Sequence, residues 1–570
     1  MKSQWVIYEE NKTLQEKFSQ EFNISGITSQ ILINRGFKDV EVIRKFLNID
    51  LQSLSFPLLL KDLEKACNRI IYSIKKNEKI LIYGDYDVDG ITSVSLLVNF
   101  FHKIGYFNVD FCIPERLTDG YGLNFKILDK LKEAKVKLII TVDCGISNVN
   151  EIDYANSLGI DVIVTDHHEI PVELPNAFAI VDPKQKKCNF PFKELAGVGI
   201  AFYLLVGLRM KLKDSKLIGE NDAVNLKQFL DLVALGTIAD ICPLYMDNRI
   251  LVKYGLKELE KGERKGIKAL KQLCGIRNGQ LNHWSIGFRL APRINAVGRL
   301  AKAELGVELL TTDNYSKALK IASLLDKSNY ERQKIEEAIL RQALKLVKAS
   351  KEFQNRSSIV LYSDSWHEGV IGIVASKIVE RYYKPTVLIT FSGSKGKGSA
   401  RSIKDFDLYE GLNLCSEYLE SFGGHKYAAG LTIKRENLRD FIDAFEKTVS
   451  SLTKPVDFVR KNLIDKKVEF DDIEDSLLKE FNMLEPFGHS NAEPTLLTED
   501  VLVTSVRVFG ANHVKLVLEQ GKNSFEALAF NKSGMNVTVG DALNVSYFPF
   551  PYKENGKNGI KLKIKNMEII

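Results

Sequence analysis

Short apolar runs alternate with amphipathic segments between residue 79 and about residue 170. Three of the runs are rich in β-branched residues and almost continuously apolar, which is typical of strands buried on both faces: KILIY (79–83), VKLIITV (136–142) and DVIVT (161–165). Residues 91–104 and 124–135, which lie between them, carry apolar positions at helical spacing. Strands that alternate with helices indicate βαβ units, so the pattern predicts a doubly wound α/β domain with a parallel sheet.

The segments on either side of this region have a helical pattern. Residues 1–78 include the amphipathic stretch DLEKACNRIIYSI, and residues 200–330 include YLLVGLRMKL and DLVALGTIADI. A long helix is predicted near 328–350, because five apolar residues there share one helical face: Ile335, Ile339, Ala343, Leu346 and Val347. We expect this helix to connect two domains.

A second α/β pattern and then an all-β pattern follow. SIVLYS (358–363) and TVLITF (386–391) are predicted strands on either side of a helix at 370–382. From about residue 457 onward, turn residues separate five strand-like segments: EPTLLTEDVLVTSVRVFG, HVKLVLEQ, SFEALAF, DALNVSYFPF and GIKLKIKNMEI. Five strands in about 80 residues suit a small barrel such as an OB-fold.

These patterns divide the chain into five parts. They are a helical N-terminal region (1–78), an α/β domain (79–325), a connecting helix (326–352), a second α/β domain (353–455) and a C-terminal β-barrel (456–570).

The composition is that of a folded soluble protein, with 45% hydrophobic and 27% charged residues among 570. It excludes a disordered chain, a collagen-like repeat and a disulfide scaffold. Seven scattered cysteines without a CxxC motif indicate a reducing compartment and no thiolate zinc motif. The first residues lack the apolar core of a signal peptide, and no run of about 18 apolar residues occurs. We therefore expect a cytoplasmic protein with no membrane association. The net charge of +6 permits a polyanionic partner without requiring one.

Acidic and histidine side chains follow three of the predicted strands directly. Asp85, Asp87 and Asp89 follow the first strand, Asp143 follows the second, and Asp166, His167 and His168 follow the third. In an extended segment, Asp85, Asp87 and Asp89 would point to one side, because the side chains of a strand alternate. The carboxyl ends of parallel strands form the edge where open α/β sheets bind ligands.

Carboxylates gathered at one edge repel each other unless cations neutralise them. A mixture of carboxylate and imidazole suits Mn²⁺ better than Ca²⁺ or an all-oxygen Mg²⁺ site. Two such ions a few ångströms apart activate a water and stabilise charge on a phosphoryl group. DYDVDG also has the form of a calcium-loop start, but Leu96 stands where that loop needs a glutamate. Any one of these motifs alone is more often a solvated turn; the three together favour a site. Asp240, an acid in an apolar helical stretch, is a weaker candidate.

The motifs also resemble a known family. GDYDVDGITS, TVDCGIS and the sequence Asp166-His167-His168 are similar to successive motifs of the DHH phosphoesterase superfamily. Six further segments resemble the RecJ family of that superfamily, including its DHH-associated domain and OB-fold: IPERLTDGYGLN (113–124), VDPKQKKCNFPFKELAGVGIAF (181–202), LGTIADICPL (235–244), GFRLAPRINAVGRL (287–300), WHEGVIGIVASKIVERYYKPT (366–386) and FGGHKYAAGLTI (422–433). LEPFGHSNAEP (484–494) resembles the lead into the OB-fold, although Ser490 and Ala492 depart from the usual pattern.

The resemblance implies an exonuclease that degrades single-stranded DNA from its 5′ end to 5′-mononucleotides. It implies Mn²⁺ or Mg²⁺ as the cofactor, with two ions bound, hydrolysis without a covalent enzyme intermediate, and a role in DNA recombination and repair. Single-stranded DNA is the implied partner, and a helicase and a single-strand-binding protein are further partners to consider. We expect a monomer, since no segment indicates an obligate interface.

Roles carry over to residues that match the motifs. The resemblance implies six metal ligands: Asp85, Asp87, Asp89, Asp143, His167 and Asp240. It places His168 near the scissile phosphate, and it makes Asp166 either a ligand or a group that orients an imidazole. Which acid of the first motif contacts which ion stays open.

Substrate contacts are expected from four arginines, whose planar guanidinium groups suit phosphate, although a surface salt bridge is an equal alternative for each: Arg116, Arg293, Arg299 and Arg401. KGKGSARS (395–402) adds Ser399 and glycines expected to expose backbone N–H groups, and Asn295 lies in one of the matching motifs. The family makes Gly423, Gly424 and His425 a substrate-holding loop; the alternative is a simple turn.

Some alternatives remain open. His367 either contacts nucleic acid or supports a helix start, and the aromatics of the barrel segment either stack on bases or fill its core. The main alternative function is a DHH phosphodiesterase for oligoribonucleotides or cyclic dinucleotides. A pyrophosphatase leaves the extra domains unexplained, and a non-catalytic scaffold should have lost motif acids, all of which are present.

Overall fold

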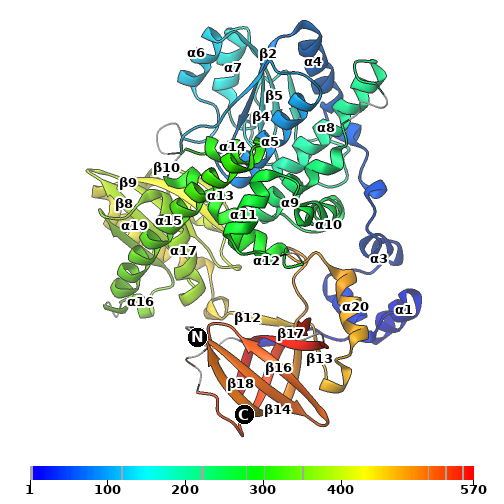
Figure 1. The fold of residues 1–570 in the computed structure, drawn as a ribbon. Coiled ribbons are helices and arrows are strands. Elements are labelled where there is room, and N and C mark those ends of the chain that lie inside the picture. The colour runs from blue at the N-terminus through cyan, green and yellow to red at the C-terminus, as the bar shows by residue number, and fades with distance from the viewer. Residues whose placement is uncertain are drawn as a thin grey trace.

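The computed structural model describes residues 4–116, 120–219, 224–277, 279–300, 302–349, 352–510, 512–532, 534, 536–554 and 557–570. Its first α/β unit is a sheet of five parallel strands in the order β3-β2-β4-β5-β6. Figure 1 labels β2, β4 and β5 of this sheet. The strands are β2 (Lys79–Gly84), β3 (Val109–Cys112), β4 (Val136–Val142), β5 (Asp161–Thr165) and β6 (Ala179–Val181). The doubly wound domain predicted from the sequence is therefore confirmed.

Helices cover both faces of this sheet because alternate strand residues point to opposite sides. Ile80 and Ile82 face a core shared with α4 (Leu63–Lys76), α5 (Val88–Lys103) and α8 (Gly197–Asp214). Leu81 and Tyr83 face a second core shared with α6 (Phe125–Glu133) and α7 (Val149–Ser157). The first core continues into a group of helices beyond the sheet: α9 (Leu230–Ala239), α10 (Met246–Lys261), α11 (Lys265–Leu273), α13 (Ala291–Leu300) and α14 (Glu304–Thr311).

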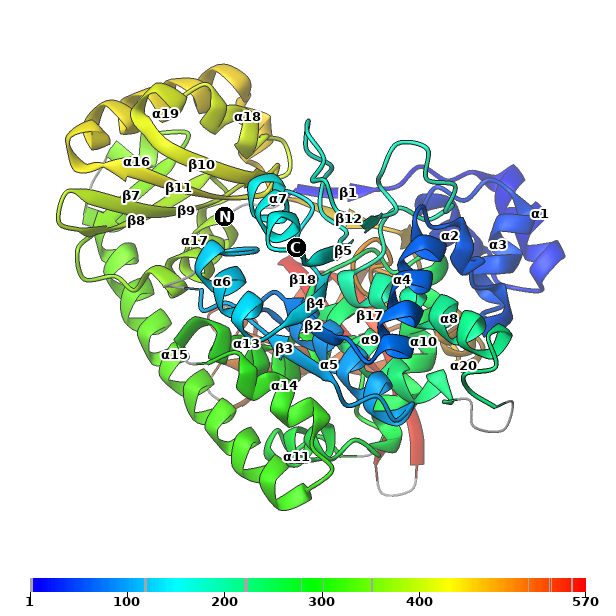
Figure 2. The ribbon, with the colours of Figure 1, turned by 90° about the horizontal axis from the view of Figure 1, so that it is seen from above.

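A long helix, α15 (Tyr315–Ala349), connects the two α/β units, and Figure 2 shows it running along the outside of the molecule between them. It begins earlier than the predicted 328–350, because its first turns also bury apolar residues. Ala318 and Leu325 pack into the core of the first unit, whereas Ala343 and Val347 pack into that of the second. The 35 residues span about 52 Å at 1.5 Å per residue.

The second unit is a five-stranded mixed sheet in the order β10-β11-β9-β8-β7. Its strands are β7 (Ile359–Ser363), β8 (Thr386–Ser392), β9 (Lys395–Arg401), β10 (Leu419–His425) and β11 (Ala428–Lys434). Helices α15 and α17 (Glu368–Tyr382) cover one face, and α18 (Leu408–Asn413) and α19 (Leu438–Leu452) cover the other.

The glycine-rich segment 395–402 does not expose its backbone N–H groups as expected, because most of it forms β9. This strand pairs with β8 on one side and β11 on the other. Its glycines instead make room for core side chains: a Cβ on Gly396 would lie 2.6 Å from the Phe391 ring, and one on Gly398 would lie 2.6 Å from a Leu431 methyl. Gly423 and Gly424 likewise belong to strand β10, at the sheet edge, and not to a free loop.

The C-terminal strands form the predicted barrel. They are β14 (Leu496–Phe509), β15 (His513–Gln520), β16 (Asn523–Ala529), β17 (Ala542–Glu554) and β18 (Lys557–Ile569). They pair in the order β14-β15-β16-β18-β17, and the pairing of β14 with β17 closes the barrel. None of the helices in the ranges that the structure describes is long and apolar enough to cross a membrane.

The N-terminal helices pack in two different places. Helices α1 (Lys12–Phe22), α2 (Gly26–Asn34) and α3 (Val40–Leu47) share a core with α20 (Asp475–Leu484) and the barrel, as Phe18, Ile31 and Phe481 show. Strand β1 (Gln4–Ile7) also pairs with β12 (Lys461–Ile464). Helix α4, in contrast, packs on the first sheet. The N-terminal segment therefore runs from the barrel to the first unit and contacts both of them.

Arg249 on α10 joins these two parts. Its side chain is 1% exposed, and its guanidinium lies 3.9 Å from the Phe46 ring centroid. The guanidinium donates to the backbone carbonyls of Phe46, Met483, Leu484 and Pro486. Burial, followed by repulsion from Arg35, lowers its pKa to about 9. One side chain from the first unit therefore donates hydrogen bonds to backbone carbonyls at the C-terminal ends of α3 and α20.

We expect Arg249→Ala to destabilise the protein by about 3 kcal/mol or more, because it leaves several buried carbonyls without a donor. Chemical denaturation followed by circular dichroism measures the loss. Arg44→Ala is the matched control, because Arg44 makes its ion pairs on the surface of α3. Equal midpoints for the two variants would contradict this account of Arg249.

Candidate active site

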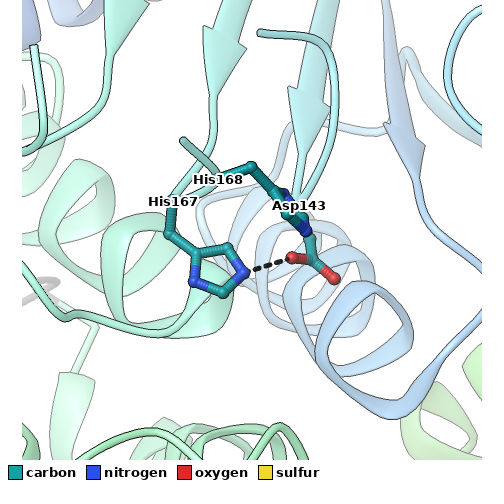
Figure 3. A group of neighbouring side chains, drawn as sticks. All are labelled: Asp143, His167 and His168. Atoms are coloured by element: carbon teal, nitrogen blue, oxygen red, sulfur yellow. Dashed lines mark ion pairs between the residues drawn. The ribbon is translucent and has the colours of Figure 1, made fainter. Parts of the chain in front are cut away.

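The carboxyl ends of β2, β4 and β5 bring the predicted acids and histidines together at one edge of the sheet. Asp85, Asp143 and Asp166 each follow directly on one of these neighbouring strands. Figure 3 shows His167 and His168 beside Asp143, with the His167 ring directed toward the carboxylate. Asp240 joins the group from the C-terminal end of α9.

The sequence pattern suggested an extended first motif. In the structure, the chain instead turns into α5 after Tyr86. Asp87 caps this helix by accepting a hydrogen bond from Gly90 N at 3.1 Å. Asp89 lies in the first turn, where its two oxygens accept from Gly197 N at 2.7 Å and Val198 N at 2.9 Å at the start of α8. Two helix N-termini therefore hold the Asp89 carboxylate, an arrangement that favours negative charge. Gly90 is required, since a Cβ there would lie 2.3 Å from the Asp85 carbonyl oxygen.

His167 lies among three carboxylates. Its Nε2 is 3.0 Å from an oxygen of Asp143, 3.8 Å from one of Asp240 and 4.0 Å from one of Asp89. Asp143 adopts a left-handed backbone conformation, with φ of 60°, and its N–H donates to Thr165 O on the neighbouring strand. Burial, followed by the charge of His168, lowers the pKa of His167. The neutral imidazole is the form that binds a metal ion.

Asp166 orients the neighbouring residues. One of its oxygens accepts from the Nδ1 of His168 at 2.7 Å and from two backbone N–H groups, and the other accepts from Ile146 N at 2.9 Å. Burial works against its charged form, but the hydrogen bond from His168, the charges of both histidines and the hydrogen bond from Ile146 together outweigh burial and lower the pKa of Asp166. Burial likewise opposes the charge of His168, yet Asp166 raises the pKa of His168 to about 9. Of the two roles expected for Asp166, orienting an imidazole fits these contacts better.

Four other carboxyl groups of the cluster have raised pKa values, so their charged forms are disfavoured in the metal-free protein. Burial, and then the neighbouring carboxylates, raise the pKa of Asp89 to about 7 and that of Asp240 to about 6. The same two causes raise the pKa of Asp85 and Asp143 well above their ordinary value. Oδ1 of Asp85 is buried with no hydrogen-bond partner in the described part of the chain.

These donors fit divalent cations. Three groups of side chains each bring their ligand atoms within 4.8 Å of one another: Asp85, Asp87 and Asp143; Asp143, His167 and His168; and His167, Asp240 and Cys242. An orphaned carboxylate oxygen and mutually repelling acids are what bound cations would satisfy. Cys242, which lies only two residues beyond Asp240, was not predicted from the sequence.

A second cluster of predicted residues lines a pocket of about 620 Å³ between the two α/β units. Six of the nine expected substrate-binding residues are there: Arg116, Arg299, Ser399, Arg401, Gly423 and Gly424. Arg299 donates to Gly369 O at 2.8 Å, and Arg401 donates to the Ser399 hydroxyl at 3.1 Å. Burial and repulsion from Arg116 lower the pKa of Arg299 to about 10, and also lower that of Arg401. The positive charge of these three arginines is uncompensated in the pocket to the extent that, beyond the effect of burial, Arg116 lowers the pKa of the other two, a setting that favours an anion.

The other three expected substrate contacts lie elsewhere. Arg293 pairs with Asp326 at 2.8 Å and donates to Arg289 O, so it joins α13 to α15. Asn295 accepts a hydrogen bond from Val88 N at 3.1 Å and thereby fixes the start of α5. His425 at the end of β10 is close enough to the metal cluster that the charge of His168, after burial, lowers its pKa.

Two of the open alternatives also have structural answers. His367 is the N-cap of α17, where its Nδ1 accepts from Gly369 N at 3.1 Å. Among the barrel aromatics, Tyr547 is fully buried in the core, whereas Phe530 is 44% exposed and packs against Phe509 and His513.

Comparison with known proteins places these features in a family. Residues 79–237 match the model of the DHH family, N-terminal domain, residues 355–451 match the DHHA1 domain, and residues 464–566 match the RecJ OB domain. A crystal structure of RecJ in complex with Mn²⁺ from Thermus thermophilus superposes with a TM-score of 0.83 at 28% identity, covering 99% of this chain and 79% of that one. The Mg²⁺ complex from the same organism has a TM-score of 0.77 at 26% identity, with 99% and 78% covered.

Curated relatives agree with this placement. The chain is 39% identical over 535 residues to the single-stranded-DNA-specific exonuclease RecJ of Bacillus subtilis, covering 93% of this chain and 66% of that relative, which is just under two thirds of its length. It is 36% identical over 484 residues to the Escherichia coli protein of the same name, covering 83% and 84%. Because the motifs, the three domain types and nearly the whole fold correspond, the chain belongs to the RecJ family.

Proposed function

We propose that the protein is a metal-dependent exonuclease that degrades single-stranded DNA 5′→3′ to 5′-mononucleotides by two-metal hydrolysis, in DNA recombination and repair. The observation that carries the proposal is the cluster of Asp85, Asp89, Asp143, His167 and Asp240, in which the first three are buried, beside an arginine-lined pocket. The names of the relatives support the substrate, and the family resemblance alone supports the polarity and the cellular role.

The metal ligands are Asp85, Asp87, Asp89, Asp143, His167 and Asp240. Two divalent cations bound there, Mn²⁺ or Mg²⁺, would activate water and neutralise charge on the phosphoryl group. Asp166 holds His168 in the protonated form through Nδ1. The Nε2–H of His168 can therefore donate to a phosphate oxygen and stabilise the charge that develops there.

The arginine pocket binds the DNA backbone. Arg116, Arg299 and Arg401 present guanidinium groups from both α/β units, so a phosphate held between them spans the two units. The closed barrel supports a longer single strand as the substrate over an oligoribonucleotide or a cyclic dinucleotide, because OB-folds bind single strands along a groove. A monomer in the cytoplasm, with a helicase and a single-strand-binding protein as partners, stays a prediction.

The central experiment digests 5′- and 3′-labelled oligonucleotides, single- and double-stranded, with Mn²⁺, Mg²⁺ or EDTA. We expect mononucleotides from the 5′ end of single strands only, and a more than about 100-fold loss of rate in Asp143→Asn, since even groups behind a metal ligand contribute 10- to 100-fold. Asp110→Asn, an exposed aspartate on β3, is the control. Cleavage that persists in Asp143→Asn or in EDTA would contradict the proposal.

Arg401→Ala should weaken binding of single-stranded DNA by about tenfold, because a charge-assisted phosphate contact is lost. The slope of log K against log[salt] should also fall in magnitude by about 0.7, the value for one phosphate contact on a single strand. Fluorescence anisotropy at several salt concentrations measures both. Arg435→Ala tests surface charge in the same unit, since Arg435 pairs with Asp364 outside the pocket. An unchanged slope in Arg401→Ala would exclude the phosphate contact.

Divalent metal should raise the melting temperature more at pH 8 than at pH 5.5. The raised pKa values of Asp240 and Asp89 mean that the folded metal-free protein holds these protons more tightly than the unfolded chain. Its stability from these groups is present below pH about 4 and is lost as the pH rises through about 6 and 7. Cations bind the deprotonated cluster and restore it. Scanning calorimetry with Mn²⁺ or EDTA tests this; equal shifts at both pH values would refute it.

A further inference from the structure

Cys242 is a buried thiol beside the acid cluster. The proposed hydrolysis has no role for this thiol. It is 8% exposed, and its Sγ lies 3.0 Å from an oxygen of Asp240. The same oxygen is 3.8 Å from the Nε2 of His167. Thiol sulfur, imidazole nitrogen and carboxylate oxygen therefore meet within 4.8 Å of one another.

The backbone fixes this thiol in place. Helix α9 ends with Cys242 N donating to Thr237 O and Ile241 N donating to Ile238 O, the paired bonds of a Schellman motif. The residue between Asp240 and Cys242 in such a motif is left-handed and is normally glycine, but here it is Ile241, with φ of 59°. A β-branched residue is sterically disfavoured in that conformation. This tight turn brings the side chains of Asp240 and Cys242 together.

The three donors match a different metal from the one that carboxylates and a histidine select. Thiolate is a soft ligand that favours Zn²⁺, whereas Mn²⁺ and Mg²⁺ favour oxygen. A tetrahedral Zn²⁺ with bonds of about 2.0 Å to N and O and about 2.3 Å to S separates N from O by about 3.3 Å and S from O by about 3.5 Å. The observed 3.8 Å and 3.0 Å differ from these by about half an ångström. Asp143 has an oxygen 3.0 Å from His167 Nε2, so a further carboxylate lies beside this group.

We propose that Cys242, His167 and Asp240 form a zinc site that overlaps the catalytic metal centre, so that Zn²⁺ bound there displaces a catalytic cation. This inference rests on the proposed function in one respect, because His167 and Asp240 belong both to the zinc site and to the proposed catalytic metal centre. Binding forms an Sγ–Zn bond and releases the thiol proton to solvent, with no change in oxidation state. The thiolate thereby adds to the zinc affinity that carboxylates and imidazole already provide. The contrasting possibility is that Cys242 only fills the core and donates to Asp240.

Cobalt substitution distinguishes the two. Co²⁺ added to the metal-free protein should give the near-ultraviolet charge-transfer band of a thiolate–cobalt bond, and Zn²⁺ should bleach it. Cys242→Ser should lose the band and bind Zn²⁺ more than about tenfold more weakly in competition with a chromophoric chelator. Cys274→Ser, a buried thiol in the same core but away from the acids, should keep both.

The wild-type spectrum stands even if Cys242→Ser fails to fold. No charge-transfer band in the wild type, or wild-type zinc affinity in a folded Cys242→Ser, would overturn the zinc site. DNA cleavage by the wild-type protein with Mn²⁺ is measured separately. Cleavage without a cobalt band would defeat the zinc site alone, and a band without cleavage would defeat the proposed nuclease alone.

Discussion

Mutual repulsion among closely placed carboxylates is the constraint on which the rest of the structure depends. Asp85, Asp89, Asp143 and Asp240 come from four separate elements, and loss of solvent around them raises the pKa of each. The fold opposes this repulsion with the helix N-termini around Asp89 and with the imidazole of His167. Such a cluster is stable in its charged form only when cations bind it. The fold therefore keeps a group of mutually repelling carboxylates at the sheet edge, where cations can bind to them.

Positive charge gathered where the two α/β units meet complements the acids. Helix α15 packs on both units, and Arg116, Arg299 and Arg401 meet where the units face each other. Under the proposed function, the arginines would hold the anionic substrate and the acids would hold the cations that act on it. Binding and chemistry would then be divided between neighbouring clusters, and the contact between the two units would determine how precisely these clusters face each other.

The sequence predicted the strands, the order of the domains and the residues of the acid cluster, because these follow from local patterns and motifs. It could not predict contacts between distant segments. Arg293 and Asn295 lie in a family motif, but their partners Asp326 and Val88 come from other elements, so the motif alone did not reveal these contacts. The glycines at 395–402 resembled an exposed loop because the core residues they admit, Phe391 and Leu431, lie on other strands. Cys242 was missed for the same reason, since His167 is 75 residues away in the sequence.

Anomalous diffraction from crystals grown with Mn²⁺ would test the central claim most directly. The account predicts two manganese peaks at the carboxyl edge of the first sheet, one in contact with His167 and both within reach of Asp143. Manganese bound elsewhere, or no peak among Asp85, Asp89, Asp143 and Asp240, would contradict it.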